Sequence, residues 1–113
     1  MGKSKKDTAY AYAAGLLDGE GYIGIPPKKN RRPGAPTIVV EITSYEVLKF
    51  LQNLFEVGPI HKCKKRQPHH LQSWRWTVKY RQAYGIAQKI APYMVLKQDK
   101  IYCILSYYKI NKS

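Results

Sequence analysis

The chain has 113 residues, which suits one domain with one modest core and leaves no room for a second catalytic domain. Twenty Lys and Arg oppose seven Asp and Glu, so the formal net charge is +13 and predicts a polyanionic partner, either nucleic acid or an anionic membrane surface. No apolar run approaches the roughly 18 residues that a membrane-spanning helix needs, so we expect no membrane span.

The first predicted element follows a basic tail, residues 1–6, and is an alanine-rich helix over residues 9–17. Asp7 or Thr8 is expected to cap its N-terminus. Gly19 and Gly21 are stop signals at its C-terminal end.

Small residues form a stripe along this helix. Ala11, Gly15 and Gly19 recur every fourth position, and Ala14 lies beside them. Such a stripe lets a second helix approach closely. Because the chain has no internal repeat, that second helix is expected to come from another copy, which predicts a homodimer.

Two carboxylates, Asp18 and Glu20, flank Gly19 at the end of the helix. The helix dipole disfavours anions there by a few tenths of a kcal/mol. A hard divalent cation such as Mg²⁺, which takes carboxylate and carbonyl oxygens, would remove that conflict. A metal shared between acids and a phosphate is a recurrent solution for phosphodiester hydrolysis.

The next elements form a hairpin and a second helix. Residues 22–25 and 37–43 are predicted strands, joined by a proline-rich basic loop or hairpin tip over residues 26–36. Ser44 is predicted to cap a helix that runs to Phe55, and Gly58-Pro59 follows as its break.

A third strand is predicted from Ile60 and a fourth over residues 73–80, with a turn at residues 67–70 between them. Apolar residues at every second position of the fourth strand, Trp74 and Trp76 among them, are assigned to the core. Two further helices are expected at residues 83–91 and 96–110.

The predicted order is therefore α-β-β-α-β-β-α-α, an α+β fold. Two hairpins that alternate with helices predict one four-stranded antiparallel sheet with helices on one face. Strand parity places Glu41, Arg75, Thr77 and Lys79 on the other face. A curved basic face of this kind is a plausible saddle for a DNA duplex.

Residues 13–21, which read AAGLLDGEG, resemble the LAGLIDADG motif of homing endonucleases. They depart from it mainly at Ala13, where the motif has Leu, and at Glu20, where it has a second Asp. The hairpin-helix order from Asp7 to Ile110 is similar to the same family, so the likeness covers nearly the whole chain. It implies the αββαββα LAGLIDADG fold in a single domain, residues 1–113, and site-specific cutting of double-stranded DNA as a homodimer on a long pseudo-palindromic target.

The resemblance also implies roles for individual residues. Glu20 matches the catalytic acid that binds the metal, and the carbonyl of Gly19 is a further candidate ligand; Mg²⁺ is the expected ion, with Ca²⁺ or Mn²⁺ as substitutes. Lys97 follows a Pro92-containing junction and matches a basic residue near the cut, where it would stabilise phosphate charge or orient water. A polar residue that the family places after the second strand would fall near Ser44.

The dimer contacts follow from the small-residue stripe and the resemblance, and the DNA contacts from charge and strand parity. The dimer interface is assigned to Ala11, Ala14, Gly15 and Asp18, with Asp18 interpreted as a structural or capping residue. The residues expected to contact DNA are Tyr22, Lys28, Asn30, Arg31, Arg32, Glu41, Lys62, Lys64, Arg66, Arg75 and Thr77.

Several alternatives stay open. The same scaffold would suit a non-cutting DNA- or RNA-binding protein, such as a maturase or regulator, and the charge alone would suit a membrane-surface or ribosome-associated protein. A zinc site built from His61, Cys63, His69, His70 and Cys103 matches no zinc spacing. Two distant cysteines and no secretory signal favour an intracellular location.

Overall fold

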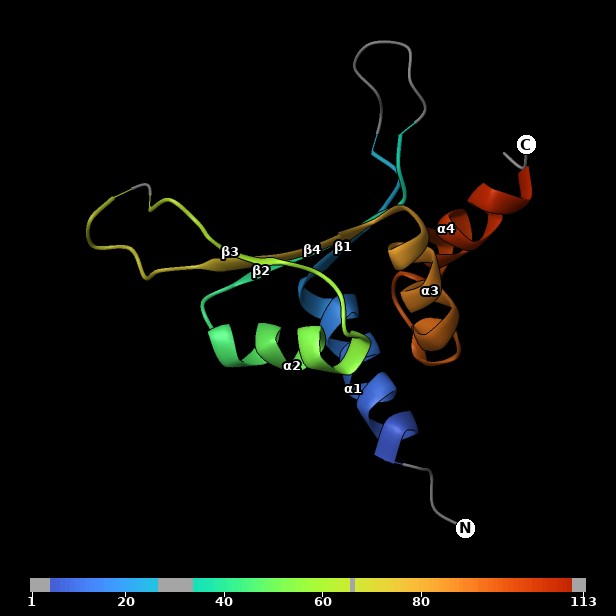
Figure 1. Ribbon diagram of the computed structural model, residues 1–113, viewed down its shortest axis with the longest axis horizontal. Coiled ribbons are helices and arrows are strands. Elements are labelled where there is room, and N and C mark those ends of the chain that lie inside the picture. Colours follow the sequence, from blue (N-terminus) through green and yellow to red (C-terminus); the bar gives the residue numbers. More distant parts are fainter. Residues whose placement is uncertain (1–4, 27–33, 66, 111–113) are drawn as a thin grey trace.

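The computed structural model describes residues 5–26, 34–65 and 67–110. Its helices and strands follow the predicted order (Figure 1). They are α1 (Lys5–Glu20), β1 (Gly21–Gly24), β2 (Thr37–Ile42), α2 (Tyr45–Phe55), β3 (Ile60–Lys62), β4 (Trp74–Lys79), α3 (Tyr80–Ile90), the 3-10 turn η1 (Ala91–Tyr93) and α4 (Gln98–Ile110).

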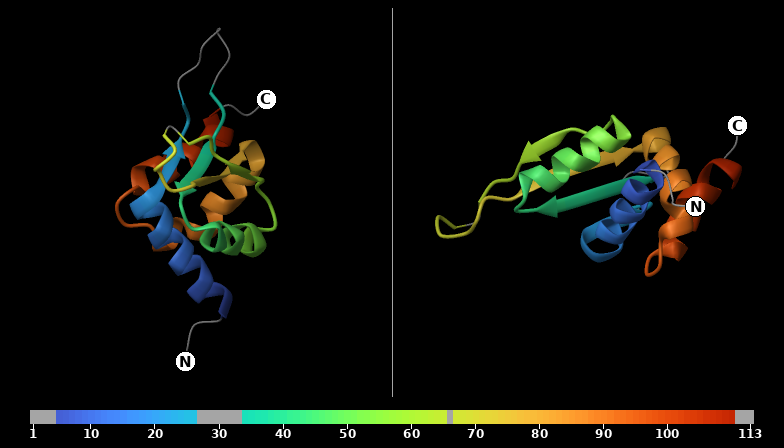
Figure 2. Two further views of the ribbon diagram at one scale, coloured as in Figure 1. Left: turned by 90° about the vertical axis from the view of Figure 1, so that its left-hand side faces the viewer. Right: turned by 90° about the horizontal axis from the view of Figure 1, so that it is seen from below.

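The four strands form one antiparallel sheet in the order β1-β2-β4-β3. The helices pack against one face, and the other face is left open (Figures 1 and 2). Because side chains alternate along a strand, Ile38 and Val40 are buried while Glu41 is exposed. The predicted sheet and its polar face are confirmed.

A single core lies between the sheet and the helices. Leu17 of α1, Ile38 of β2, Trp76 of β4 and Ile104 of α4 are fully buried in it. The indole Nε1 of Trp76 donates to the Val57 carbonyl at 3.0 Å, so its one polar atom is satisfied. Trp76 therefore lies in the core as predicted, whereas Trp74 is only half-buried.

Gly58 makes the close approach of the chain to Trp76 possible. Its φ of 97° lies in the left-handed region, and a Cβ there would stand 2.2 Å from the Trp76 Nε1. A side chain at this position would meet both backbone strain and a clash. The predicted break after α2 is thus required by core packing as well as by helix termination.

Three predicted helix starts differ from the structure, and that of α4 is Gln98 instead of residue 96. Helix α1 begins at Lys5, so Asp7 and Thr8 lie inside it instead of capping it, and Lys5 and Lys6 belong to the helix and not to a tail. Helix α3 begins at Tyr80, directly after β4, with Tyr80 in the left-handed region at φ 58°. Tyr80 had been assigned to the fourth strand.

Candidate functional site

Asp18, in the last turn of α1, reaches across to the start of α4. Its carboxylate accepts hydrogen bonds from the backbone N–H groups of Val95 (2.7 Å), Leu96 (3.1 Å) and Lys97 (2.9 Å). Burial alone would raise the pKa of Asp18, but these three donors and the nearby Lys97 charge hold that pKa below its ordinary value. Asp18 therefore fixes the backbone just before α4 from a distant part of the chain.

Lys97 makes the reciprocal contact, from the start of α4 back to the end of α1. Its Nζ donates to the carbonyl of Gly21 at 2.6 Å and to the carbonyl of Leu17 at 3.2 Å. These carbonyls lie at the end of α1, where orphan acceptors and the helix dipole favour a cation. Asp18 and Lys97 together form a reciprocal clamp, which fixes the end of α1 against the start of α4.

Glu20 is the last residue of this fixed helix end and is exposed. Because Asp18 is buried and held by backbone donors, Glu20 is the carboxylate that faces solvent here. Among the described residues, no group of three or more His, Cys, Asp and Glu could hold a metal ion. At this helix end, the described part of the chain thus offers the Glu20 carboxylate and backbone carbonyls as oxygen donors, without a cluster of further side-chain ligands.

One face of α1 lies open. Gly15 and Gly19 are exposed, and a Cβ added to either residue would meet nothing within 4 Å, while Ala11 is partly exposed. Ala14 and Asp18 do not share that face: both are buried inside the chain, with exposed fractions of 0% and 8%. A partner that approaches this face would therefore meet Ala11, Gly15 and Gly19, but not Ala14 or Asp18.

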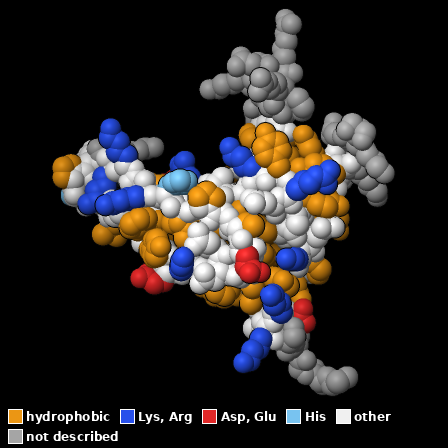
Figure 3. All heavy atoms as spheres, viewed as in Figure 1, with side chains coloured by type: hydrophobic (Ala, Val, Ile, Leu, Met, Phe, Trp, Pro, Cys, Tyr) orange, Lys and Arg blue, Asp and Glu red, His pale blue; other side chains and the backbone are white. Residues whose placement is uncertain are grey.

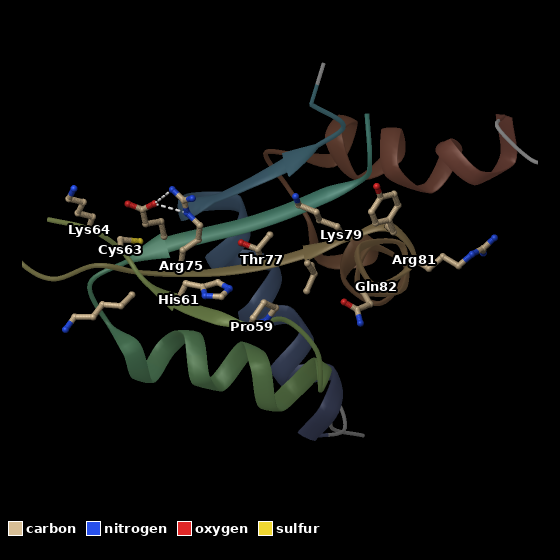
Figure 4. Close-up of a pocket in the computed structure, with 13 residues that line it drawn as sticks. Pro59, His61, Cys63, Lys64, Arg75, Thr77, Lys79, Arg81 and Gln82 are labelled. Atoms are coloured by element: carbon tan, nitrogen blue, oxygen red, sulfur yellow. Dashed lines mark hydrogen bonds and ion pairs between the residues drawn. The ribbon is translucent and has the colours of Figure 1, made fainter. Parts of the chain in front are cut away.

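A groove of about 960 Å³ runs over the open face of the sheet and onto the first turn of α3 (Figure 4). Strand β4 contributes Arg75, Thr77, Val78 and Lys79, and β2 contributes Glu41. The rest of the lining comes from the β3 segment and from α3: Pro59, His61, Lys62, Cys63, Lys64, Tyr80, Arg81 and Gln82.

His61, Arg81 and Gln82 are polar lining residues that were not among the predicted contacts. His61 pairs with Arg75 across β3 and β4, so strand parity alone would have placed it on the open face. Arg81 and Gln82 line the groove because α3 follows β4 without a loop. No local pattern predicted that tight junction.

Glu41 and Arg75 face one another across β2 and β4 and form an ion pair within the groove. The Glu41 Oε1 accepts from Arg75 Nε at 3.1 Å and from Nη2 at 2.6 Å (dashed in Figure 4). The Arg75 hydrogen bond lowers the pKa of Glu41, and Glu41 in turn raises the pKa of Arg75. Both side chains remain largely accessible, at 54% and 42%.

Charge is unevenly distributed over the molecule. Residues 57–98, which include the groove strands β3 and β4, contain no Asp or Glu. On the face shown in Figure 3, the visible acidic side chains lie over α1 and α2, while Lys and Arg side chains extend to both ends of the sheet. The open face is therefore the natural place for a polyanion.

The other predicted DNA contacts divide into three groups. Tyr22 is exposed on the open face, opposite Val39, and Lys64 is exposed at the edge of the groove. Lys62 borders the groove, but its Nζ lies 6.0 Å from the centre of the Trp74 ring, on the parity of the helix-covered face. The others lie outside the described residues: Lys28, Asn30, Arg31, Arg32 and Arg66.

Ser44 is committed to helix α2. Its Oγ accepts from the Val47 N–H at 3.3 Å, which is the predicted N-cap.

In the part of the chain that the structure describes, no helix combines the length and apolar character needed to cross a membrane.

Solved structures share this fold over most of the chain. The homing endonuclease I-CvuI in complex with its target aligns with a TM-score of 0.75 and 20% identity, over 92% of this chain and 68% of that one. The archaeal intron-encoded homing endonuclease I-Vdi141I, complexed with DNA, aligns with a TM-score of 0.69 and 21% identity, over 94% of this chain and 68% of that one. The LAGLIDADG meganuclease I-CpaMI, bound to uncleaved DNA, aligns with a TM-score of 0.72 and 18% identity, over 91% of this chain and 38% of that one.

The chain therefore has the LAGLIDADG homing endonuclease fold. No protein-family model matches the sequence, and a search of curated proteins found no match.

Proposed function

We propose that this chain is a site-specific, metal-dependent DNA endonuclease that works as a homodimer. The observation that carries the proposal is the position of Glu20. The clamp of Asp18 and Lys97 fixes this exposed carboxylate at the end of α1, directly before the edge strand β1 of the sheet. On the same fold, solved homing endonucleases are bound to DNA.

The groove is the proposed duplex site. Lys79, Arg81 and Lys64 line it at different points along its length, so several phosphates would find cations there. Side chains of β4 and β2 project from its floor, where they would meet base edges in the major groove. A face without acids over residues 57–98 would hold the duplex without charge repulsion from that segment.

The oxygen donors at the α1 end fit a hard divalent cation such as Mg²⁺. Glu20 and the carbonyl of Gly19 are the candidates to hold it; Asp18 is excluded, because its carboxylate oxygens are already committed to backbone N–H groups. When bound, the ion would supply Lewis-acid stabilisation and an activated water. Remaining ligands would come from water, the scissile phosphate and a partner copy. I-CvuI complexes with DNA were solved in the presence of Ca and of Mg.

Lys97 has two roles at this site, in positioning the helix end and in binding phosphate. An ammonium has three N–H donors, and two are used on the carbonyls of Gly21 and Leu17. The third is free to approach a phosphate oxygen near Glu20. In that position its charge would stabilise the negative charge that develops in phosphodiester cleavage.

Dimerisation brings two such sites together. The open α1 face of Ala11, Gly15 and Gly19 would let a second copy approach closely, and each chain would then direct its own Glu20 to one DNA strand. A single copy has one Glu20 and so lacks the second site that a double-strand cut needs.

The test begins with selection of bound sequences from a random duplex pool, followed by cloning of a selected sequence into a plasmid. With Mg²⁺, the wild-type protein is expected to linearise the plasmid. Glu20→Gln keeps the shape of the side chain but removes its charge, so we expect cutting to fall by at least about 100-fold while binding persists. Glu46→Gln, an exposed acid in the first turn of α2, serves as the matched control and should cut normally.

Persistent cutting by Glu20→Gln would remove Glu20 from the chemistry. Binding without cutting by the wild-type protein would instead favour the second candidate function, a DNA-binding regulator or maturase on this fold. The observation that favours this alternative is Ser44, whose hydroxyl accepts the Val47 N–H as the cap of α2, so the polar residue after the second strand has a structural role here.

A further inference from the structure

The Glu41–Arg75 pair leaves one end of the guanidinium uncommitted. A guanidinium carries five N–H donors in a planar fork. Glu41 Oε1 takes the edge formed by Nε and Nη2. The opposite end, which carries the two N–H groups of Nη1 and the second N–H of Nη2, is therefore available as a pair of parallel donors.

This free end faces the groove and not the core. Arg75 and Thr77 share the open parity of β4, and His61 lies opposite Arg75 on β3 (Figure 4). The Arg75 side chain is 54% exposed although Glu41 restrains it. The guanidinium is thus oriented by its partner and still reachable by a ligand.

A carboxylate beside the arginine argues against a phosphate as that ligand, because Glu41 would repel the phosphate charge. A base edge is neutral and raises no such conflict. Guanine offers O6 and N7, two adjacent acceptors in the major groove, whereas adenine offers one acceptor and one donor. The free fork of Arg75 matches guanine, and Glu41 Oε2 can accept from the N4 amino group of a cytosine.

We propose that the Glu41–Arg75 pair reads a guanine in each half of the DNA target, with Glu41 as the residue that orients Arg75. This inference rests on the proposed function, because it needs a duplex in the groove. It names the base that a specific pair of side chains selects.

The register places this guanine near the cut. Glu41 follows Val40, and Val40 pairs with Gly21, the residue after Glu20. Arg75 lies on β4, two strand spacings from β1, which is about 10 Å. At about 3.4 Å per base pair, 10 Å corresponds to about three base pairs. The reach of the side chains adds to this distance, so the guanine is expected within about five base pairs of the cleaved phosphate.

The test measures the Kd of the wild-type protein for the selected duplex and for every single base-pair replacement in it. Replacement of the guanine should weaken wild-type binding by about 5- to 150-fold. Arg75→Lys keeps the charge but removes the fork, so its discrimination at that position should fall below about threefold. Glu41→Gln should discriminate less than the wild-type protein. Lys89→Arg exchanges the same two side chains at an exposed position of α3 outside the groove and should leave the base preference unchanged.

The possible failures are distinct. If no duplex is bound, the proposed function fails and this inference fails with it. If the wild-type protein binds DNA with no guanine preferred near the cut, or if Arg75→Lys keeps the wild-type preference, the inference alone is overturned.

Discussion

Two carboxylates separated by one residue have opposite environments in this protein. Asp18 is buried and accepts three backbone hydrogen bonds, while Glu20 is exposed beyond the helix end. The difference arises because side chains two residues apart on a helix point to different faces. One acid therefore holds the site in shape, and the other is free for chemistry.

The clamp predicts a specific dependence of stability on pH. The pKa of Asp18 in the folded state lies below its ordinary value of 3.8, so between the two values the unfolded state binds more protons. The stabilisation is complete above pH 3.8 and is lost as the pH falls through the folded pKa. Asp18→Asn should lower the free energy of unfolding by about 1–2 kcal/mol at pH 7, with a smaller difference near pH 3.

Urea unfolding followed by circular dichroism at several pH values measures this difference. Glu56→Gln removes an exposed carboxylate and should change the free energy of unfolding by less than about 0.5 kcal/mol throughout. An Asp18→Asn difference that is the same at pH 7 and pH 3 would contradict a charged clamp.

Part of this residue-scale arrangement could be predicted from sequence. Asp18 was interpreted as structural, and the resemblance to the LAGLIDADG motif gave Glu20 its functional role. The partners of Asp18, at residues 95–97, were not predictable, because no local pattern links segments about 80 residues apart. The second contact of the clamp, from Lys97 to the end of α1, could not be predicted for the same reason.

At the scale of elements, α1 combines a buried face with an open one. Leu17, Ala13 and Ala14 pack in the core, whereas Gly15 and Gly19 face open space. The four-residue spacing of small residues predicted a face for close approach, but it did not separate Ala14 from Ala11. Ala14 and Ala11 differ because the rotation of α1 about its axis turns Ala14 toward the core. A single sequence does not show on which side of a helix the core lies.

The open face predicts a variant that folds but does not dimerise. Gly15→Leu adds a side chain where a Cβ meets nothing within 4 Å, so the monomer should fold at least as well, because Gly is a poor helix former. A second helix could no longer approach closely, so Gly15→Leu should be monomeric at concentrations where the wild-type protein is dimeric.

Sedimentation velocity distinguishes the two states. Gly85→Leu is the matched control: Gly85 is a helical glycine of α3, and a Cβ there also meets nothing within 4 Å, so the wild-type association should persist. Equal association of Gly15→Leu and Gly85→Leu would exclude the α1 face as the interface.

Elements and their order were more predictable than their ends. Periodicity identified four strands and four helices, because core burial imposes it on the sequence. The start of α3 at Tyr80 was not predicted, because a tyrosine in the left-handed region with its N–H bound to the Pro36 carbonyl depends on tertiary contact. That junction adds Arg81 to the groove.

For the whole molecule, net charge and fold act together. The excess of +13 predicts affinity for polyanions without saying where they bind. The fold concentrates the effect, because β3 and β4 of the acid-free segment 57–98 form part of the open sheet, while the acids visible in Figure 3 lie over α1 and α2. The same composition on another fold would bind nucleic acid without a defined groove.

This distribution predicts how DNA affinity depends on salt. Each phosphate contact releases counterions and contributes about −0.9 to the slope of log K against log salt concentration. Lys79→Gln with Arg81→Gln removes two cations from the groove, so the slope should become shallower by about 1.8 for one protomer, and by about twice that for a dimer on a full target. Lys49→Gln with Lys89→Gln removes the same charge from exposed positions on α2 and α3 outside the groove and should leave the slope nearly unchanged. Fluorescence anisotropy titrations from about 50 to 200 mM salt give both slopes. Equal changes for the two double variants would mean that net charge alone, and not the groove, holds the DNA.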